Sequence, residues 1–287
     1  MEQPSAPTAP YRTRLDVLFA ASAPTAVILR RGPRTHWRLI TWDLRRDSFT
    51  PGQWMRGQIR LCDLSPNGKK LIYWAAQHHA SAMWQRTSRR SLRARPYDPL
   101  TAPAAKPSRA GRRIPRYMQG AYRGTSPSPQ RITGTWTAIS TPPYFTALAI
   151  WPAFGHWTGG GLFQDNQSIL IGEPDDRMIP IENVAIPRTT RVASWFGTGR
   201  GLNPSARRPS DPDVDLRRAL TDFGATWVDW VHHDGDDLLF ACDGCIYRLV
   251  RGGAATTAEE LRAARQIADF RDMRFEGIAA PTDAMQW

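Results

Sequence analysis

The fold is decided by the stretch Cys62-Asp63-Leu64-Ser65-Pro66-Asn67-Gly68-Lys69-Lys70-Leu71-Ile72-Tyr73. Two short apolar segments, residues 61–64 and 71–76, stand on either side of the polar run formed by residues 65–68. An Asn-Gly pair supplies the positive φ angles that tight turns between antiparallel strands require. The stretch therefore predicts a β-hairpin.

The same arrangement, a pair of apolar segments around a polar turn, recurs along the chain. Asp-Gly pairs mark two of the reversals, and β-branched and aromatic residues fill many of the arms. The further predicted hairpins pair 26–30 with 37–44 around Gly32-Pro33, 161–163 with 168–171 across 164–167, 225–231 with 238–241 across 232–236, and 238–242 with 245–250 through Asp243-Gly244.

Alternation within residues 37–44 shows how such a strand is buried. Trp37 and Leu39 fall on one face, and Ile40 and Trp42 fall on the other. Because both faces carry large apolar side chains, we expect this strand to be covered on both sides.

Regularly spaced hairpins of this kind favour an all-β sandwich, barrel or propeller. The related turns and the twelve Trp residues favour a β-propeller-like domain, in which sheets pack face to face around an axis. At about 40–45 residues per four-stranded blade, the roughly 225 residues outside the leader and the insertion described below make about five blades.

Two helices are expected in the C-terminal half. Thr257 and Glu260 match a capping box, which predicts a short surface helix whose apolar face continues to Ala268. A second candidate helix spans residues 213–222. The last strand is expected at residues 273–278, after the capped helix.

Most of the positive charge lies in residues 86–131. The chain carries a formal net charge of +12, and this stretch holds twelve Lys and Arg against the single acid Asp98. Seven prolines are spread among those bases. Such a segment cannot bury enough apolar surface to order itself. The sequence therefore predicts a disordered basic insertion in an otherwise near-neutral domain.

The predicted organisation is a disordered leader (1–10), one β-propeller-like domain built from 11–85 and 132–287, and the insertion 86–131. Three cysteines are too few for a disulfide framework, so a reducing, cytoplasmic location is expected. No apolar run reaches the ~18–20 residues of a membrane span. Asp16 and Pro24 interrupt the apolar segment near the N-terminus, which argues against a secretory signal.

The turn Ser65-Pro66-Asn67-Gly68-Lys69 resembles the hairpins of TolB-like and WD40-like propeller repeats, which usually carry Ser-Pro-Asp-Gly-Lys, so Asn67 is a departure. The chain also resembles a group of uncharacterised bacterial proteins through short runs on both sides of the insertion. These are Trp42-Asp43-Leu44, Pro51-Gly52-Gln53-Trp54, Trp136-Thr137-Ala138-Ile139-Ser140, Gly159-Gly160-Gly161-Leu162-Phe163 and Asp269-Phe270-Arg271-Asp272-Met273-Arg274-Phe275-Glu276. The first resemblance implies a propeller fold, and the second implies no activity.

The basic insertion indicates binding to an acidic partner. Its charge would steer association with nucleic acid or with an acidic protein face, mainly through non-specific contacts. The alternative is a solvated loop whose charge serves solubility. The residues expected to make the contact are Arg89, Arg90, Arg93, Arg95, Arg112, Arg113 and Arg116.

The Cys242-x-x-Cys245 pair and the neighbouring His232-His233 are candidates for a metal site. The two cysteines flank a two-residue turn, so they are expected to face each other across a hairpin. Zinc would need further ligands that no second Cys-x-x-Cys provides, and small residues filling a strand pair are the favoured interpretation. No metal and no cofactor are predicted.

Classical catalytic motifs are missing from the sequence, and the leading prediction is a non-enzymatic binding platform. The alternative is a carboxylate-dependent, glycosidase-like hydrolase with a site on the propeller axis. Such a site requires a central pocket in which two or three carboxylates converge. The carboxylates considered for it are Asp43, Asp63, Asp165, Asp229 and Glu276.

Overall fold

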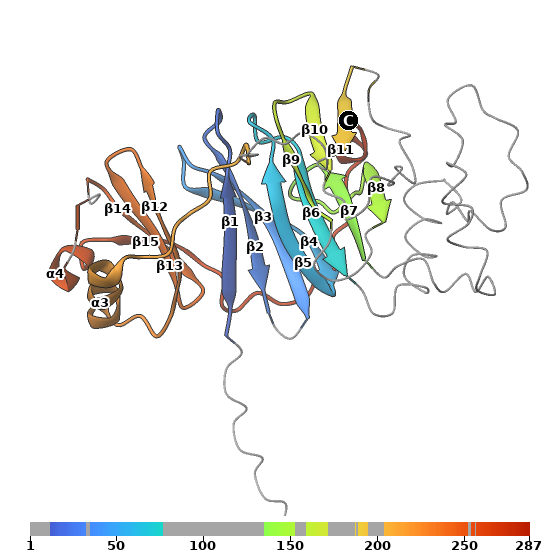
Figure 1. The fold of residues 1–287 in the computed structure, drawn as a ribbon. Helices are drawn as coiled ribbons and strands as arrows, with labels where there is room; N and C mark the ends of the chain where they lie inside the picture. The colour runs from blue at the N-terminus through green and yellow to red at the C-terminus, as the bar shows by residue number, and fades with distance from the viewer. Residues whose placement is uncertain are drawn as a thin grey trace, which may run out of the picture.

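The computed structural model describes residues 12–32, 35–76, 135–152, 159–171, 187, 189–194, 204–251, 254–255 and 257–287. These residues form strands that group into four sheets, together with two α-helices and a 3-10 turn (Figure 1). The prediction of an all-β fold is confirmed. The leader 1–10 and the insertion 86–131 lie outside the described residues.

Each sheet follows the order of the chain. Sheet A contains β1 (Arg14–Phe19), β2 (Thr25–Arg31), β3 (His36–Asp43) and β4 (Ser48–Arg56). Sheet B contains β5 (Gln58–Leu64), β6 (Leu71–Ala76), β7 (Thr135–Ser140) and β8 (Ala149–Pro152). Sheet C contains β9 (Gly161–Phe163), β10 (Ser168–Ile171) and β11 (Arg191–Ser194), and sheet D contains β12 (Val228–Asp234), β13 (Asp237–Cys242), β14 (Cys245–Leu249) and β15 (Arg265–Asp269).

Strand pairing is antiparallel throughout sheets A, B and D, whereas β11 runs parallel to β10 in sheet C. All five predicted hairpins are present in the structure. One predicted turn is too long, because His232 and His233 belong to β12. The reversal there takes place at Gly235 and Asp236, after Asp234 has paired with Asp237.

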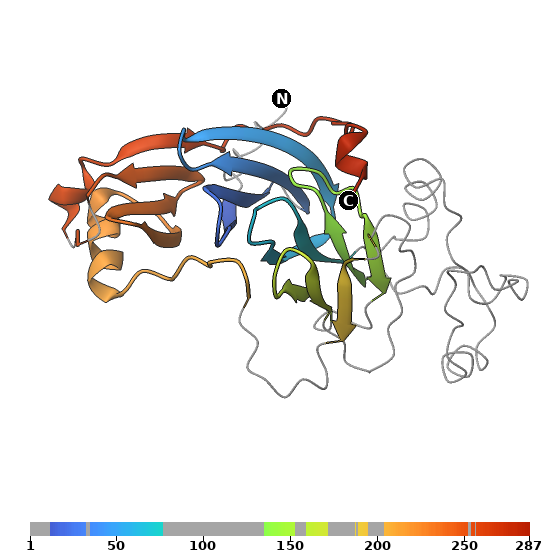
Figure 2. The same ribbon diagram turned by 90° about the horizontal axis from the view of Figure 1, so that it is seen from above.

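The four sheets follow one another in the order D, A, B, C. The first strands meet, because β1 lies beside both β5 and β12, and β9 lies beside β5. Viewed from above, the sheets form an open arc (Figure 2). This arrangement places the opening strands of sheets A, B and D around a common point.

Sheet A is buried on both faces, as the alternation in β3 predicts. Trp37 and Leu39 pack with sheet B, whereas Ile40 and Trp42 pack with sheet D. A third cluster lies between sheets B and C and includes Trp151. Within the described residues, these interfaces between sheets bury Trp37, Trp42, Trp151 and Trp230.

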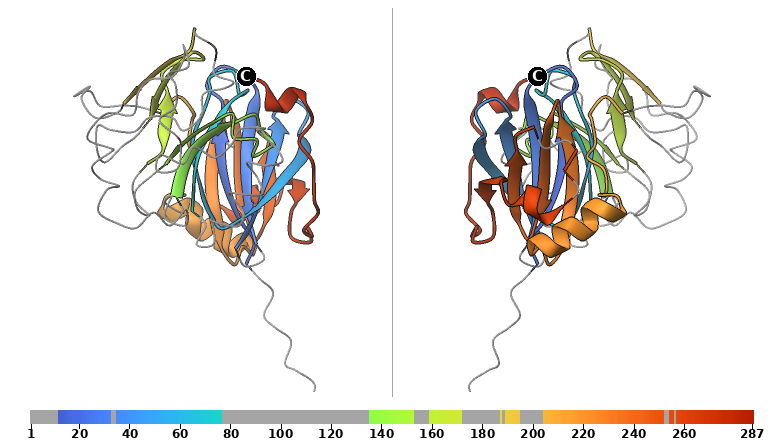
Figure 3. Two further views of the ribbon diagram at one scale, coloured as in Figure 1. Left: turned by 90° about the vertical axis from the view of Figure 1, so that its right-hand side faces the viewer. Right: turned by 90° about the vertical axis from the view of Figure 1, so that its left-hand side faces the viewer.

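Helix α3 (Val214–Phe223) confirms the second predicted helix. Asp213 caps its first turn by accepting from the backbone N–H of Leu216, and Gly224 ends it with a φ of 112°. Together with α4 (Ala258–Leu261), this helix covers the face of sheet D that points away from sheet A (Figure 3). One end of the row of sheets is therefore closed by helices.

The capping box of Thr257 and Glu260 forms as predicted, but α4 ends at Leu261. The expected continuation to Ala268 is wrong, because residues 265–269 pair with β14 as strand β15. The strand expected at 273–278 is also wrong. That segment runs alongside sheet A as an irregular strap. It is held there because Arg38 donates to Glu276 and Gln53 donates to the carbonyl of Ile278 at 3.0 Å.

The strap (residues 270–287, including the 3-10 turn Asp283–Met285) joins three sheets. It begins after β15 of sheet D, where the buried Arg30 of sheet A donates to the carbonyls of Phe270 and Arg271 at 2.9 Å each. It ends at sheet B, where Lys70 donates to the carbonyl of Gln286 at 3.1 Å. Among the described residues, no helix has the length and apolar character needed to cross a membrane.

Candidate functional site

A cavity of about 320 Å³ opens where the first strands of sheets A, B and D meet. We call it the Asp16 pocket. It is lined by Asp16 and Val17 of β1, Ile59, Arg60 and Leu61 of β5, Asp229 and Trp230 of β12, and the segment Arg208, Pro209, Ser210 and Asp211. The pocket thus draws on residues that are more than two hundred positions apart in the chain, from Asp16 to Trp230.

The segment that completes the pocket is fixed by backbone pairing on both sides. Phe19 and Arg207 exchange hydrogen bonds of 2.9 and 2.8 Å, and Ser210 and Val231 exchange bonds of 2.9 and 3.0 Å. Arg208 lies between these two anchors and donates to the carbonyls of Leu61, at 3.3 Å, and Cys62. The segment therefore links β1, β5 and β12 at the pocket.

Asp229 is the buried carboxylate of the pocket, with only 2% of its side chain exposed. Its Oδ2 accepts from the backbone N–H of Leu15 at 3.0 Å. Its Oδ1 has no hydrogen-bond partner among the described residues and lies 3.6 Å from Nε of Arg14. Burial raises the pKa of Asp229 to about 6, Asp16 adds to this rise, and the Leu15 hydrogen bond, Arg14 and Arg12 oppose it.

Asp16 is the exposed carboxylate of the pocket. Neighbouring protein atoms still exclude enough water to raise its pKa, against the opposing charges of Arg14, Arg31 and Arg208. Two carboxylates with raised pKa values, one exposed and one buried, therefore line the same cavity. This pairing distinguishes the Asp16 pocket as a functional candidate.

The raised pKa of Asp229 predicts a pH-dependent effect of Asp229→Asn. Between about pH 4 and 6 the folded state holds a proton that the unfolded state has released, so ionisation of Asp229 lowers stability as pH rises. Asn keeps an acceptor for Leu15 and removes this effect. The stability of the variant relative to the native protein should therefore rise by about 2 kcal/mol between pH 4.5 and 7.5, measured by urea unfolding.

The comparison must be made against the native protein at each pH. Burial lowers the pKa of His232 to about 4, so this group makes stability rise with pH over an overlapping range. His232 is present in both proteins and cancels in the difference. An equal stability difference at both pH values would contradict the assignment for Asp229.

Of the five carboxylates considered from the sequence, the structure brings only Asp229 to this pocket. Asp43 accepts from the backbone of Arg45 in a turn, Asp165 accepts from Gln167 and Ser168 in another turn, and Glu276 pairs with Arg38. The three are placed at separate points of the fold and do not join Asp229 in this pocket.

Asp63 is fully buried and organises the contact between sheets B and C. It accepts four backbone N–H groups, from Leu64 at 3.0 Å, Phe163 at 2.8 Å, Ser205 at 2.9 Å and Ala206 at 2.7 Å. Burial raises its pKa, and these four donors oppose the rise. These hydrogen bonds join β5 to β9 and to residues 205–206, so the role of Asp63 is structural.

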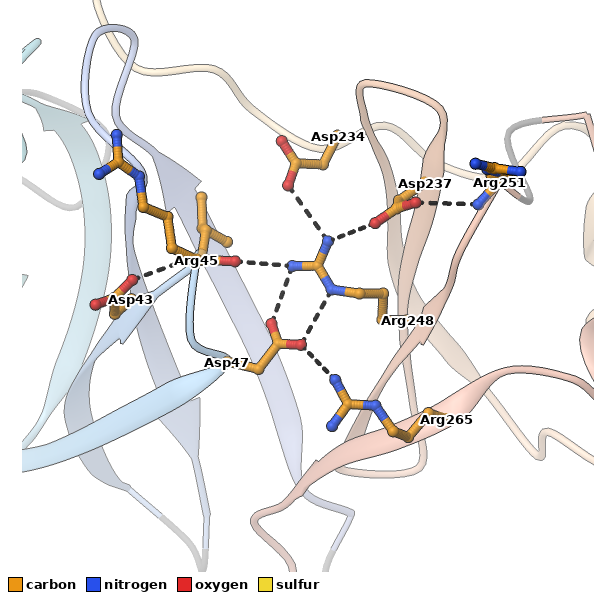
Figure 4. Close-up of polar contacts among 9 residues, drawn as sticks. Asp43, Arg45, Asp47, Asp234, Asp237, Arg248, Arg251 and Arg265 are labelled. Carbon is orange, nitrogen blue, oxygen red and sulfur yellow. Dashed lines mark hydrogen bonds and ion pairs between the residues drawn. The ribbon is translucent and has the colours of Figure 1, made fainter.

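Arg248 has the corresponding role between sheets A and D (Figure 4). Its guanidinium forms a two-bond contact with Asp47, at 3.1 and 2.9 Å, and donates to Asp237 at 2.9 Å. It also donates to the carbonyl of Leu44 at 3.2 Å and lies 3.5 Å from Asp234. Asp47 and Leu44 belong to the loop between β3 and β4. The Arg248 side chain of sheet D therefore binds this loop of sheet A.

The candidate metal ligands are not brought together. Cys242 and Cys245 face each other as register partners, as predicted, but His232 and His233 pair with Leu239 and Leu238 near the other end of the hairpin. Burial raises the pKa of Cys242 to about 12, so its thiol stays protonated at neutral pH. Within the described part of the chain, no group of three His, Cys, Asp or Glu side chains is arranged to hold a metal ion.

The seven arginines predicted to bind a partner, from Arg89 to Arg116, lie outside the described residues. Sequence reasoning missed Asp16 and Asp211 as pocket residues. A usable signal was present for Asp16, since it stands as a single charge within the apolar run Leu15–Phe19. Comparison with known protein families, with curated proteins and with solved structures found no match for this chain.

Proposed function

We propose that this protein is a non-enzymatic binding platform that engages an acidic partner through its basic insertion. The observation that carries the proposal is the separation of charge. Residues 86–131 contain twelve basic residues and one acid, whereas the rest of the chain is nearly balanced. A positive charge that is concentrated in one stretch of the chain attracts polyanions and binds them.

The body suits the role of a rigid support. Four sheets with their first strands at the centre and their faces packed together resemble blades of an open, propeller-like arc. Helices α3 and α4 cover the outer face of sheet D. They occupy the face on which a further blade would pack, so the arc stays open at sheet D. We propose this arrangement in place of a ring of about five blades.

The insertion is attached at a single point of the body. Strand β6 ends at Ala76, β7 begins at Thr135, and these two residues are register partners. A two-residue turn can therefore replace residues 77–134 without moving either strand. Ala76 also pairs with Gln58, which precedes the pocket residue Ile59, so the described part of β6 ends at the end of sheet B where β5 enters the Asp16 pocket.

Two variants test the proposal by a salt titration of binding to a labelled DNA duplex and, separately, to a labelled polyglutamate peptide. One variant replaces residues 77–134 with Asn-Gly, and its matched control keeps the full length but changes Arg89, Arg90, Arg93, Arg95, Arg112, Arg113 and Arg116 to Gln. If all seven contact phosphates, the slope of log affinity against log salt for DNA should be about 6 units shallower in both variants. Unchanged affinity and slope would mean that the insertion is only a spacer.

A second candidate is favoured by the pocket itself. Three carboxylates, Asp16, Asp211 and Asp229, line one cavity at the meeting point of first strands, and a carboxylate-dependent hydrolase draws its acid and its base or nucleophile from such a set. The raised pKa of Asp229 supports a proton-donating role near neutral pH. Nitrophenyl glycosides test this candidate, and failure of the native protein to release nitrophenol from any of them would count against it.

A further inference from the structure

The donors and the acceptors that line the Asp16 pocket differ in how far they are already hydrogen-bonded within the protein. The arginines already hold protein acceptors through one nitrogen each, because Nη2 of Arg208 donates to the carbonyls of Leu61 and Cys62, and Nη2 of Arg60 donates to the carbonyl of Gly159 at 3.2 Å. The Arg60 guanidinium also lies over the ring of Trp74, 5.5 Å from its centre. The pocket's arginines are therefore already committed to protein acceptors and to an aromatic face.

Several carboxylate oxygens of the pocket accept no hydrogen bond from the described residues, although Asp229 Oδ2 accepts from the Leu15 N–H. Within the described chain, neither Asp16 nor Asp211 accepts a hydrogen bond, and both side chains are exposed. Behind them lies Asp229, almost completely buried, with Oδ1 unpaired by any hydrogen bond apart from its 3.6 Å contact with Arg14. Buried polar atoms in proteins normally have a partner, so an unpaired carboxylate oxygen beside a cavity is informative.

The lining of the pocket is polar for the larger part and includes four apolar residues that belong to the cores between the sheets. Val17, Ile59, Leu61 and Trp230 contribute side chains that are at most 6% exposed. A hydrocarbon chain can lie against these residues while its polar end meets the carboxylates. The chemistry that satisfies both parts is a cation with N–H donors on a short apolar stem.

We propose that the Asp16 pocket binds a small molecule that carries a protonated amine or guanidinium group. The cationic group donates to Asp16 and Asp211 at the exposed side, and the negative charge of Asp229 attracts it from behind. The apolar stem lies against Ile59 and Trp230. The site does not involve the basic insertion, so it stands independently of the platform function.

Three probes of similar size test the proposal by ligand-observed NMR titration of the full-length protein at pH 7.5. They are butylguanidinium, its uncharged isostere butylurea, and the anion butyrate. Butylguanidinium should bind at least about tenfold more tightly than butylurea, since a hydrogen bond to a charged group is worth about 1.5–3 kcal/mol. Butyrate should not bind. Equal affinity for butylguanidinium and butylurea, or binding of butyrate alone, would overturn the proposal.

Variants locate the binding on the protein. Asp16→Asn should weaken butylguanidinium binding by about tenfold or more, and Asp16 is exposed, so folding should be unaffected. Asp222→Asn removes an exposed carboxylate at the end of α3 and should leave the affinity unchanged. The variant that lacks residues 77–134 should bind the probe like the native protein. Unaltered affinity in Asp16→Asn, or no detectable binding to the native protein, would refute the assignment.

Discussion

Replacing Asp63 with Ala is expected to lower the free energy of unfolding by about 4 kcal/mol or more, the largest effect of any single substitution considered for this protein. The change leaves four buried backbone N–H groups without an acceptor, and each such group costs about 1–3 kcal/mol. Three of the four belong to residues beyond Gly160, so sheet C and the segment at 205–206 lose these hydrogen bonds to β5. Urea unfolding followed by Trp fluorescence measures the loss.

Asp43→Ala is the matched control. Asp43 is also an aspartate next to a hairpin turn, but its side chain is 39% exposed and accepts from a single backbone N–H, that of Arg45 at 2.9 Å. Its removal should cost less than about 1 kcal/mol. Similar losses for the two variants would show that Asp63 does not hold the sheets together. Asp63→Asn removes only part of the acceptor, because an amide accepts through one oxygen whereas the carboxylate accepts through two.

Replacing Arg248 with Met should lower the free energy of unfolding by about 3 kcal/mol. Met fills part of the same volume but leaves Asp237 without its cationic partner and leaves Asp47 with only the exposed Arg265. Asp47 is only 12% exposed, so water cannot fully replace the lost contacts. Lys would not restore them, because an ammonium cannot make the two-bond contact with Asp47.

Arg265→Met provides the internal control, since Arg265 contacts the same oxygen of Asp47 at 2.7 Å. Arg265 is 67% exposed, and an exposed ion pair contributes about 0–1 kcal/mol. A double-mutant cycle between Arg248→Met and Asp47→Asn should show a coupling of about 1 kcal/mol or more. Strictly additive losses would contradict the role assigned to the Arg248 contacts.

The sequence predicts the hairpins well because the information for a tight turn is local. Asn67-Gly68 and Asp243-Gly244 specify reversals without help from the rest of the chain, and both occur where they are expected. Helix α3 was predictable for the same reason, since Asp213 and Gly224 mark its two ends. Local chemistry therefore defines most individual elements.

The errors arise where distant partners decide the outcome. Residues 265–269 follow a well-formed capping box, yet they become β15 because the free edge of β14 is available to them. Residues 273–278 look like a strand but follow β4 as an irregular strap. Asp16 stands out in the sequence as a single charge in an apolar run, but the pocket around it was not predictable, because it exists only where three sheets meet and the sequence does not determine how the sheets are arranged.

The two hydrogen bonds from Ser205 and Ala206 to Asp63 span 142 and 143 residues, while most strand pairs join neighbours in the chain. Local pairings can form early, because closing a short loop costs little entropy. We therefore expect the preformed sheets to dock late in folding, after the rate-limiting barrier. Contacts made late slow the unfolding reaction more than they speed refolding. The buried charges between the sheets therefore govern how long the native state persists once it has formed.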